Sequence, residues 1–443
     1  MVVRVHRGQS LFTRKAMTLS PTARTLFTLV SCCLLAEPGI AQGLPRARPE
    51  DVGLSAAALE RIATTLQSYV DSGKYPGVLA VVARHGKLAY LASVGWMDVE
   101  HQRAMSSDAV FRIYSLTKPI ASAAVMQLYE RGKLRLDDPV SKYIPAFAGV
   151  KVYAGGGAAT PVLRDPERPV TLADLLTHTS GLTYGFIGNL PADSIYRRAG
   201  LNDPRWTLAQ LSDSLAHLPL AFSPGSRWNY GYSIDVLARV VEVVSGMTFD
   251  RYLESALFQP LGMSMTAFHV TPGMEGHLMA LFTRGTDGKL QAPTPLISTD
   301  YTPEGRMLSG GGGLLSTMGD YLRFAQMLLN GGELDGHRVL KRETVALMMR
   351  DHLPPGLTPI PTVTSDWPPG RNGFGYGGAV RVDSDTSPPG SSGTFRWAGG
   401  ATTFFWIDPK ADLVAMVWSQ YRPVTWSLDG QFQRLVYASL SGR

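Results

Sequence analysis

Two strand-rich blocks, one near each end of the 443-residue chain, restrict the possible folds more than any other feature. In the first block, residues 55–72 have apolar residues at helical spacing and precede two apolar runs, 78–84 and 88–93, separated by the turn-like His85-Gly86-Lys87. The second block contains four apolar runs: residues 379–382, 394–397, 403–407 and 413–418. A helical pattern follows over residues 429–440. This mirrored order predicts one antiparallel sheet, built from both ends of the chain and flanked by terminal helices.

The long stretch between the two blocks is mainly helical in pattern. Five segments have apolar residues at helical spacing: residues 172–176, 208–215, 234–245, 249–258 and 318–329. The predicted fold class is therefore α+β, with an inserted, mainly helical domain beside the sheet. We expect residues 42–114 and 320–443 to form a discontinuous α/β sheet domain and residues 115–319 to form the helical domain, with the active site at their interface. Residues 353–370 contain six prolines and are expected to form an exposed loop.

The first 41 residues have the composition of a secretory leader. Five basic residues precede a mostly apolar stretch, residues 25–36, and the small residues Gly39 and Ala41 follow it. The apolar stretch is too short to form a stable membrane span. We therefore predict that residues 1–41 are a signal peptide and that the mature protein is periplasmic or secreted. Two alternatives remain open: translation starts at Met17, or Cys32 carries a lipid as in a lipoprotein.

Removal of this leader would lower the net charge of the protein and remove both of its cysteines. The chain holds 42 basic and 36 acidic residues, and five basic and one acidic residue lie in the leader, so the formal charge falls from +6 to +2. A nearly neutral protein is not expected to bind nucleic acid. Cys32 and Cys33 both lie in the leader, so the mature chain has no thiol for catalysis, metal binding or a disulfide.

The most informative chemical motif is the segment from Ser115 to Pro119. Pro119 fits only in the first turn of a helix, so Ser115 is predicted at or just before the helix start, with Lys118 on the same face. No other charged residue lies between Arg112 and Glu130. We infer a desolvated lysine with a lowered pKa that serves as a base for the Ser115 hydroxyl, beside helix N–H groups that can stabilise an oxyanion. In the alternative, Ser115 only caps the helix and Lys118 extends to solvent.

This segment and four others resemble a known family. Ser115-x-x-Lys118 is similar to the S-x-x-K motif of the serine β-lactamase-like superfamily, which contains class C β-lactamases, penicillin-binding proteins and family VIII carboxylesterases. Four further segments match that family in the same order along the chain: residues 175–182, 224–230, 311–317 and 397–400. The resemblance covers most of the mature chain and implies the β-lactamase and penicillin-binding-protein fold.

The resemblance also implies roles for individual residues. Tyr230, at the tyrosine position of the second motif, would work with Lys118 to take the proton from Ser115 and return it to the leaving group. Which of Lys118 and Tyr230 is the formal base stays open, because their titrations would be coupled. The backbone N–H groups of Ser115 and Gly400 would form the oxyanion hole.

Two departures from the family pattern bear on the substrate. The second motif reads Tyr230-Gly231-Tyr232 instead of Tyr-x-Asn, and the third reads Trp397-Ala398-Gly399 instead of Lys-Thr-Gly. An indole and a methyl group replace the lysine and hydroxyl that would hold a substrate carboxylate, so we expect uncharged, apolar acyl or alcohol groups. A tryptophan at this position is similar to family VIII carboxylesterases. The predicted substrate-binding residues are Trp397, Gly399, Tyr232 and Tyr114.

Other residues are expected to support the site. Ser233 is predicted to cap the helix after Tyr230, and Gly246 to end it. His178 is predicted to stabilise its own loop rather than to transfer protons. Four more aromatic residues are expected to shape the acyl pocket: Tyr184, Phe186, Trp228 and Trp367. Because no histidine pair has metal-ligand spacing, no metal site is predicted.

Together, the residues and the resemblance predict an exported serine esterase. It would cleave small-molecule esters with short to medium acyl chains through an acyl-enzyme on Ser115, with weak β-lactam hydrolysis and no cofactor. One alternative is a class C-type β-lactamase or D-alanyl-D-alanine peptidase. A second alternative is a non-catalytic binding module of the cell envelope. The sequence does not indicate the oligomeric state.

Overall fold

The computed structural model describes most of the mature chain: residues 43–201, 203–291, 301–302, 307–357, 360, 371–383 and 389–441. The predicted signal peptide, Trp367 and most of the proline-rich segment lie outside these residues. No helix within the described ranges is long and apolar enough to cross a lipid bilayer. Residues 40–443 form one compact unit, and their division into a sheet domain and a helical domain stays a prediction.

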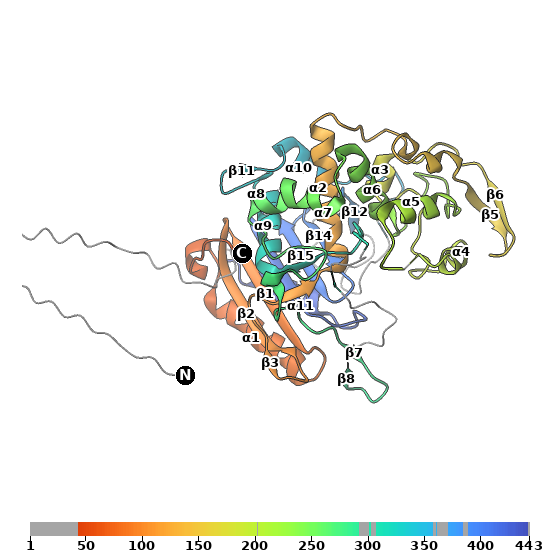
Figure 1. The fold of residues 1–443 in the computed structure, drawn as a ribbon. Helices are drawn as coiled ribbons and strands as arrows, with labels where there is room; N and C mark the ends of the chain where they lie inside the picture. The colour runs from red at the N-terminus through yellow and green to blue at the C-terminus, as the bar shows by residue number, and fades with distance from the viewer. Residues whose placement is uncertain are drawn as a thin grey trace, which may run out of the picture. The chain divides into compact units, whose positions relative to one another are not determined.

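An antiparallel sheet of eight strands is built from both ends of the chain, in the order β12-β13-β14-β15-β16-β1-β2-β3 (Figure 1). Its strands are β1 (Gly77–Arg84), β2 (Lys87–Asp98), β3 (Arg103–Ala104), β12 (Asn372–Phe374), β13 (Ala379–Arg381), β14 (Phe395–Gly399), β15 (Thr403–Asp408) and β16 (Leu413–Trp418). The first strand pairs with the last, and Leu79 lies opposite Trp418. The predicted α+β fold class and the pairing of the two terminal blocks are therefore confirmed.

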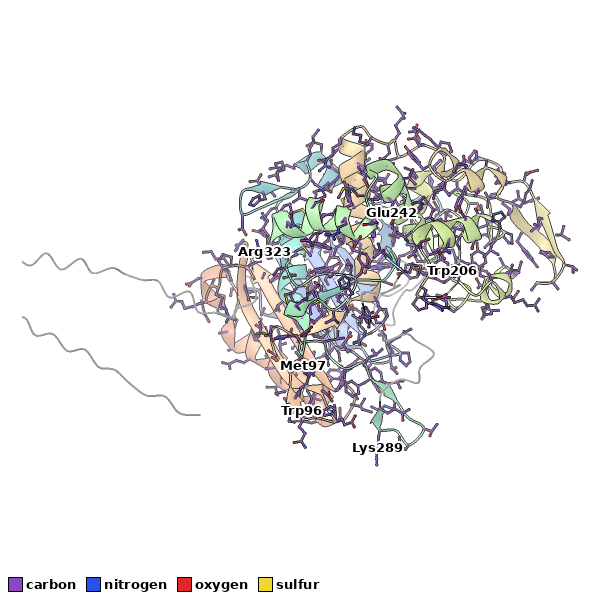
Figure 2. All side chains as sticks on the ribbon, viewed as in Figure 1. Trp96, Met97, Trp206, Glu242, Lys289 and Arg323 are labelled. Atoms are coloured by element: carbon purple, nitrogen blue, oxygen red, sulfur yellow. The ribbon has the colours of Figure 1, made fainter. Side chains whose placement is uncertain are left out.

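The central strands β1, β15 and β16 are buried on both faces, which explains why they read as continuous apolar runs. Successive side chains of a strand point to opposite faces, and in β1 Leu79 and Ala80 accordingly belong to two different apolar clusters. The same alternation continues in β15 and β16. Near the edge of the sheet, in β2, Trp96 is 39% exposed whereas its neighbour Met97 is 5% exposed (Figure 2).

Two terminal helices cover one face of the sheet, as predicted. They are α1 (Ala56–Asp71) and α11 (Leu428–Ala438), which contact each other. The Ser55 hydroxyl accepts a hydrogen bond from the backbone N–H of Ala58 and thereby caps α1. Leu59 and Ile62, on one stripe of α1, pack with α11 against the sheet in a single apolar cluster.

The opposite face of the sheet supports the segment that carries Ser115. Helix α9 (Met318–Leu329) packs on β15 and β16, and α2 (Thr117–Glu130) contributes side chains to the same apolar cluster. The Tyr321 hydroxyl of α9 donates a hydrogen bond to the backbone oxygen of Leu116, at 3.0 Å. A small ladder between β4 (Val110–Arg112) and β9 (Leu315–Thr317) holds the two chain segments that lead into α2 and α9.

The predicted helices of the middle stretch are present, with two corrections. The remaining α-helices and strands are α3 (Leu172–Leu176), α4 (Asp193–Arg198), α5 (Leu208–Ala216), α6 (Ser233–Ser245), α7 (Phe249–Leu253), α8 (Gln259–Leu261), α10 (Arg342–Met348), β5 (Val152–Gly156), β6 (Pro161–Arg164), β7 (Thr283–Arg284), β8 (Leu290–Gln291), β10 (Glu333–Leu334) and β11 (His337–Arg338). The second half of the predicted helix 249–258 is a π-helix, η5 (Glu254–Phe258). Helix α6 ends at Gly246 in the left-handed conformation, as expected. Ser233 is not its cap, because Tyr232 occupies that position and the Ser233 hydroxyl instead bonds the hydroxyl of Ser180 at 2.9 Å.

Candidate active site

Ser115 lies in a tight turn immediately before a buried helix. The turn, η2 (Tyr114–Leu116), follows β4 and leads directly into α2, in which Pro119 is the third residue. Proline is tolerated there because the first N–H groups of a helix have no partner within the helix. Tyr114 adopts a positive φ of 43°, a conformation that non-glycine residues rarely adopt. The predicted position of Ser115 at the helix start is therefore correct.

Lys118 is completely buried next to Ser115. Its Nζ lies 3.3 Å from the Ser115 Oγ, and it donates hydrogen bonds to the Tyr184 hydroxyl at 3.0 Å and to the Gly311 backbone oxygen at 2.6 Å. The Tyr230 ring lies under the same amine, 4.5 Å from Nζ to the ring centroid. The alternative in which Lys118 extends to solvent is wrong.

Burial lowers the pKa of Lys118 to about 7, and the nearby Asp235 carboxylate only partly opposes this effect. Removal from water disfavours the charged ammonium form, and an opposite charge favours it. A substantial fraction of the amine is therefore neutral near pH 7. A neutral amine at hydrogen-bond distance from a hydroxyl can accept its proton.

Tyr230 presents a buried hydroxyl beside Ser115. Burial raises its pKa well above the ordinary value of a phenol, and polar interactions with Ser115 and Trp397 only partly oppose that rise. In the described part of the chain, this hydroxyl has no hydrogen-bond partner that satisfies it. Tyr230 is thus a protonated phenol at neutral pH with a free capacity to donate or accept a proton.

One support of the site, Asp235, lies outside the motifs that the sequence analysis identified. The buried Asp235 carboxylate of α6 accepts hydrogen bonds from the Ser309 hydroxyl at 2.5 Å and from the Gly311 N–H at 3.0 Å. Asp235 therefore fixes the glycine-rich loop whose carbonyl group binds Lys118. The available signal was a single acidic residue on the apolar face of a helix, four positions after Gly231.

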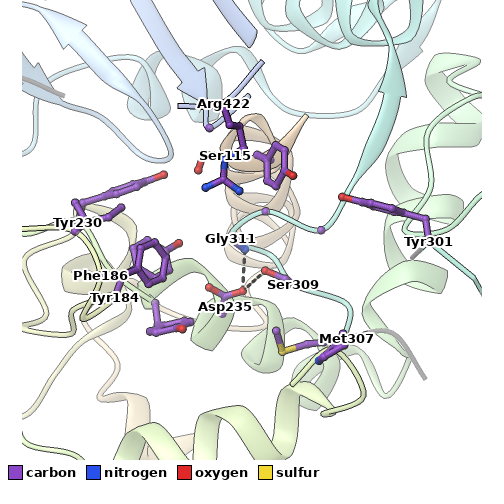
Figure 3. A pocket seen from close by; sticks show the side chains of 17 residues that line it. Ser115, Tyr184, Phe186, Tyr230, Asp235, Tyr301, Met307, Ser309, Gly311 and Arg422 are labelled. Atoms are coloured by element: carbon purple, nitrogen blue, oxygen red, sulfur yellow. Dashed lines mark hydrogen bonds between the residues drawn. The ribbon is translucent and has the colours of Figure 1, made fainter. Parts of the chain in front are cut away.

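A cavity of about 460 Å³ opens over Ser115 (Figure 3). Of the residues predicted to contact substrate or oxyanion, Tyr114, Tyr232 and Gly400 line this cavity together with Ser115 and Tyr230. Two residues proposed as pocket aromatics, Tyr184 and Phe186, also line it, with stacked rings whose centroids are 5.1 Å apart. The structure thus brings most of the predicted site together in one opening.

Trp397 and Gly399 occupy different positions from those predicted. Trp397 does not line the cavity; its side chain is fully buried and packs against Tyr230 and Phe374, with ring centroids 5.4 and 5.2 Å apart. The sheet is buried on both faces, so the strand pattern did not reveal toward which side this indole points. Gly399 also lies outside the cavity lining and instead permits close approach, since a Cβ there would lie 2.4 Å from the Ile113 oxygen.

The pattern of the beta-lactamase family matches residues 62–438, which form most of the chain. The chain belongs to the beta-lactamase family. This match confirms the resemblance to the serine β-lactamase-like superfamily that was inferred from five short motifs.

Three proteins that are similar to this chain illustrate the activities found among its relatives. Esterase EstB from Burkholderia gladioli is 33% identical over 387 residues, which cover 82% of this chain and 90% of EstB. An unliganded structure of simvastatin synthase (LovD) from Aspergillus terreus superimposes with a TM-score of 0.76 at 26% identity, over 88% of this chain and 100% of LovD. The structure of EstCE1, a hydrolase with promiscuous acyltransferase activity, gives a TM-score of 0.70 at 26% identity, over 87% of this chain and 99% of EstCE1.

The remaining family motif residues act as supports in this beta-lactamase-family chain. His178 is fully buried, and burial lowers its pKa well below the ordinary value of histidine. Its backbone oxygen accepts a hydrogen bond from Asn229, and its ring lies 4.8 Å from that of Tyr230. Trp228 stacks on Tyr230 from outside the cavity lining. His178 therefore lies behind Tyr230 and contacts neighbouring segments, which agrees with the predicted loop-stabilising role.

Family membership and geometry together define the general class of the protein. It is a β-lactamase-fold serine enzyme of the hydrolase or acyltransferase kind. Among the described residues, no group of three or more histidine, cysteine or acidic side chains is arranged to hold a metal ion.

Proposed function

We propose that the protein is a serine esterase that cleaves carboxylic esters through an acyl-enzyme on Ser115. The observation that supports this most directly is the buried Lys118 amine, which lies 3.3 Å from the Ser115 hydroxyl and has a pKa lowered to about 7. An adjacent base with a pKa near the working pH is what a serine nucleophile requires.

The first half of the reaction forms the acyl-enzyme. The Ser115 oxygen attacks the ester carbonyl carbon as its proton passes to the neutral amine of Lys118. The backbone N–H groups of Ser115 and Gly400 donate to the oxyanion that develops on the carbonyl oxygen. The carbon–oxygen bond to the alcohol then breaks, and Tyr230 donates its proton to the leaving alkoxide, because its raised pKa keeps the phenol protonated. The Lys118 ammonium returns a proton to Tyr230.

The second half releases the acid. Water attacks the acyl carbon and gives a proton to the same lysine and tyrosine relay, and Ser115 leaves as the regenerated hydroxyl. An alcohol in place of water would yield a new ester, which is acyl transfer. The description of the related EstCE1 as a hydrolase with promiscuous acyltransferase activity supports acyl transfer as a second activity of the same acyl-enzyme.

A comparison of two substrate classes tests the proposal. We expect kcat/KM for 4-nitrophenyl butyrate to exceed kcat/KM for a chromogenic cephalosporin. Ser115→Ala should abolish ester turnover, and a covalent serine phosphonate should label Ser115 in the wild type. A clear preference for the cephalosporin would favour the β-lactamase alternative. Absence of turnover on a broad ester panel would favour the binding module.

Product analysis separates hydrolysis from transfer. With a small alcohol added at increasing concentration, a hydrolase releases acid throughout, whereas a transferase converts a growing share of the acyl group to the new ester. We also propose that the enzyme is exported, on the evidence of the leader-like residues 1–41.

A further inference from the structure

The cavity beside Ser115 contains a cation that the proposed mechanism does not use. Arg422 follows β16, and its side chain enters the pocket from the top of the view in Figure 3. Its guanidinium carbon lies 5.2 Å from the centroid of the Tyr114 ring. Since Tyr114 immediately precedes the nucleophile, this charge lies next to the position where an ester would react.

The Arg422 guanidinium has no carboxylate partner in the described part of the chain. Arg323, a partly buried arginine elsewhere in the chain, is by contrast paired with Asp335. The guanidinium of Arg422 contacts the face of the Tyr114 ring, and none of its N–H groups donates to an acceptor among these residues. A guanidinium presents a planar fork of donors that matches a carboxylate.

The cavity lining contains one other charged side chain among the described residues, and its hydrogen bonds are made elsewhere. Asp235 is the one carboxylate among the residues that line it, and its charge interacts with that of Lys118 behind the cavity wall. The Asp235 carboxylate accepts hydrogen bonds from the Ser309 hydroxyl and the Gly311 N–H, and no ion pair joins it to Arg422 in the described part of the chain. Arg422 is the only basic side chain among the described residues that line the cavity.

This cation changes the expectation drawn from the third motif. The loss of the lysine and hydroxyl at Trp397-Ala398 predicted an uncharged substrate. Arg422 brings a cation to the cavity from a different segment, after the last strand of the sheet. Two exposed apolar side chains also line the cavity, Phe186 at 58% and Ile187 at 42%, and they suit an apolar portion of the same molecule.

We propose, on the basis of the proposed esterase function, that the cavity selects esters that carry a carboxylate and that Arg422 binds this carboxylate beside Ser115. The substrate class is thus an ester with one anionic end and one apolar portion. The carboxylate belongs either to the acyl part or to the alcohol part, and two pairs of esters separate these cases.

Each ester pair differs only in charge. The acyl pair is the mono-4-nitrophenyl ester of adipic acid and the 4-nitrophenyl ester of adipamic acid. The alcohol pair is 3-carboxyphenyl butyrate and 3-carbamoylphenyl butyrate. In the wild type, we expect kcat/KM to favour the carboxylate over the amide by about 10- to 100-fold in one pair, as expected for a charge-assisted hydrogen bond.

Variants of Arg422 test whether this residue is the cause. Arg422→Met keeps an apolar stem against Tyr114 and should bring the preference ratio close to one. Arg422→Lys should retain part of the preference, because it keeps the charge and loses the fork. The matched control is Arg61→Met, which removes an exposed arginine of α1 outside the cavity and should leave the ratio unchanged.

Three results would overturn the inference. The first is a wild type without preference in either pair. The second is an Arg422→Met variant with an unchanged ratio, which would show that Arg422 only braces Tyr114. The third is equal affinity of Ser115→Ala for the carboxylate and the amide members of both ester pairs, measured by calorimetry. That binding measurement needs no turnover, so failure of the esterase proposal, seen as no cleavage of any ester, is distinguishable from failure of the Arg422 proposal.

Discussion

Replacement of Lys118 by methionine should abolish activity and yet stabilise the protein at neutral pH. The side chain is completely buried, and its pKa falls from 10.5 to about 7. Because the unfolded chain then binds more protons between about pH 7 and pH 10.5, stability rises with pH across that window. The cost of burying Lys118 is fully present below pH 7 and disappears above pH 10.5.

The magnitude follows from this linkage. At 1.36 kcal/mol per pKa unit, the protonation of Lys118 in the unfolded chain disfavours folding by roughly 4 kcal/mol at pH 7 and by less than about 1 kcal/mol at pH 10. Methionine removes this cost but also removes three hydrogen bonds, to Ser115, Tyr184 and Gly311, worth about 1 kcal/mol each. Lys118→Met should therefore be about 1 kcal/mol more stable than the wild type at pH 7 and about 2 kcal/mol less stable at pH 10.

Urea unfolding of both proteins at pH 7 and pH 10 measures this difference. The matched control is Lys87→Met, which removes an exposed lysine from β2 and so separates burial from the loss of one positive charge. Ester hydrolysis by Lys118→Met should fall by at least about 1,000-fold, since the base is lost. A change in unfolding free energy that is the same at both pH values would refute the reasoning, because it would mean that the amine titrates alike in the folded and unfolded states.

Four further outcomes are expected. The kcat/KM for a neutral ester should rise with pH through about 7 and then level off, because the reaction needs the neutral amine of Lys118; a profile flat from pH 5 to 9 would contradict this. Tyr230→Phe should lower kcat by about 100- to 10,000-fold with an unchanged circular dichroism spectrum, and near wild-type turnover would remove Tyr230 from the relay. Gly399→Ala should lower the urea midpoint, because its Cβ would lie 2.1 Å from the Thr403 Oγ1; an unchanged midpoint would show that β14 can shift. The N-terminal sequence of exported protein should begin just after Ala41, and a retained leader would contradict export.

The sheet and its helices were predictable because their signals are local. Hairpin residues between β1 and β2, a capping serine before α1 and apolar runs of strand length are all read from neighbouring residues. The pairing of β4 with β9 joins segments about 200 residues apart, and short runs of three residues carry no signal of their own. The misassigned cap at Ser233 reflects a competing tertiary contact, because that hydroxyl serves Ser180 instead of its own helix.

The site was predictable only as far as its motifs extend. Ser115 and Lys118 are three residues apart, so helical geometry alone brings them together. The partners that hold the amine, Tyr184 and the Gly311 carbonyl, come from segments 66 and 193 residues away. Trp397 was assigned to the cavity because a motif position specifies a neighbourhood in space but not the direction of a side chain.

Because β1 pairs with β16, the sheet cannot be completed until the C-terminal part of the chain has been synthesised. Leu79 has no neighbour on one side until Trp418 has been made, and Trp418 also packs against Phe111, four residues before the nucleophile. A chain that ends before β16 would leave β1 as an open sheet edge, which favours aggregation over folding. A product truncated before β16 is therefore expected to lack enzymatic activity, because the contacts of Trp418 with β1 and with Phe111 cannot form.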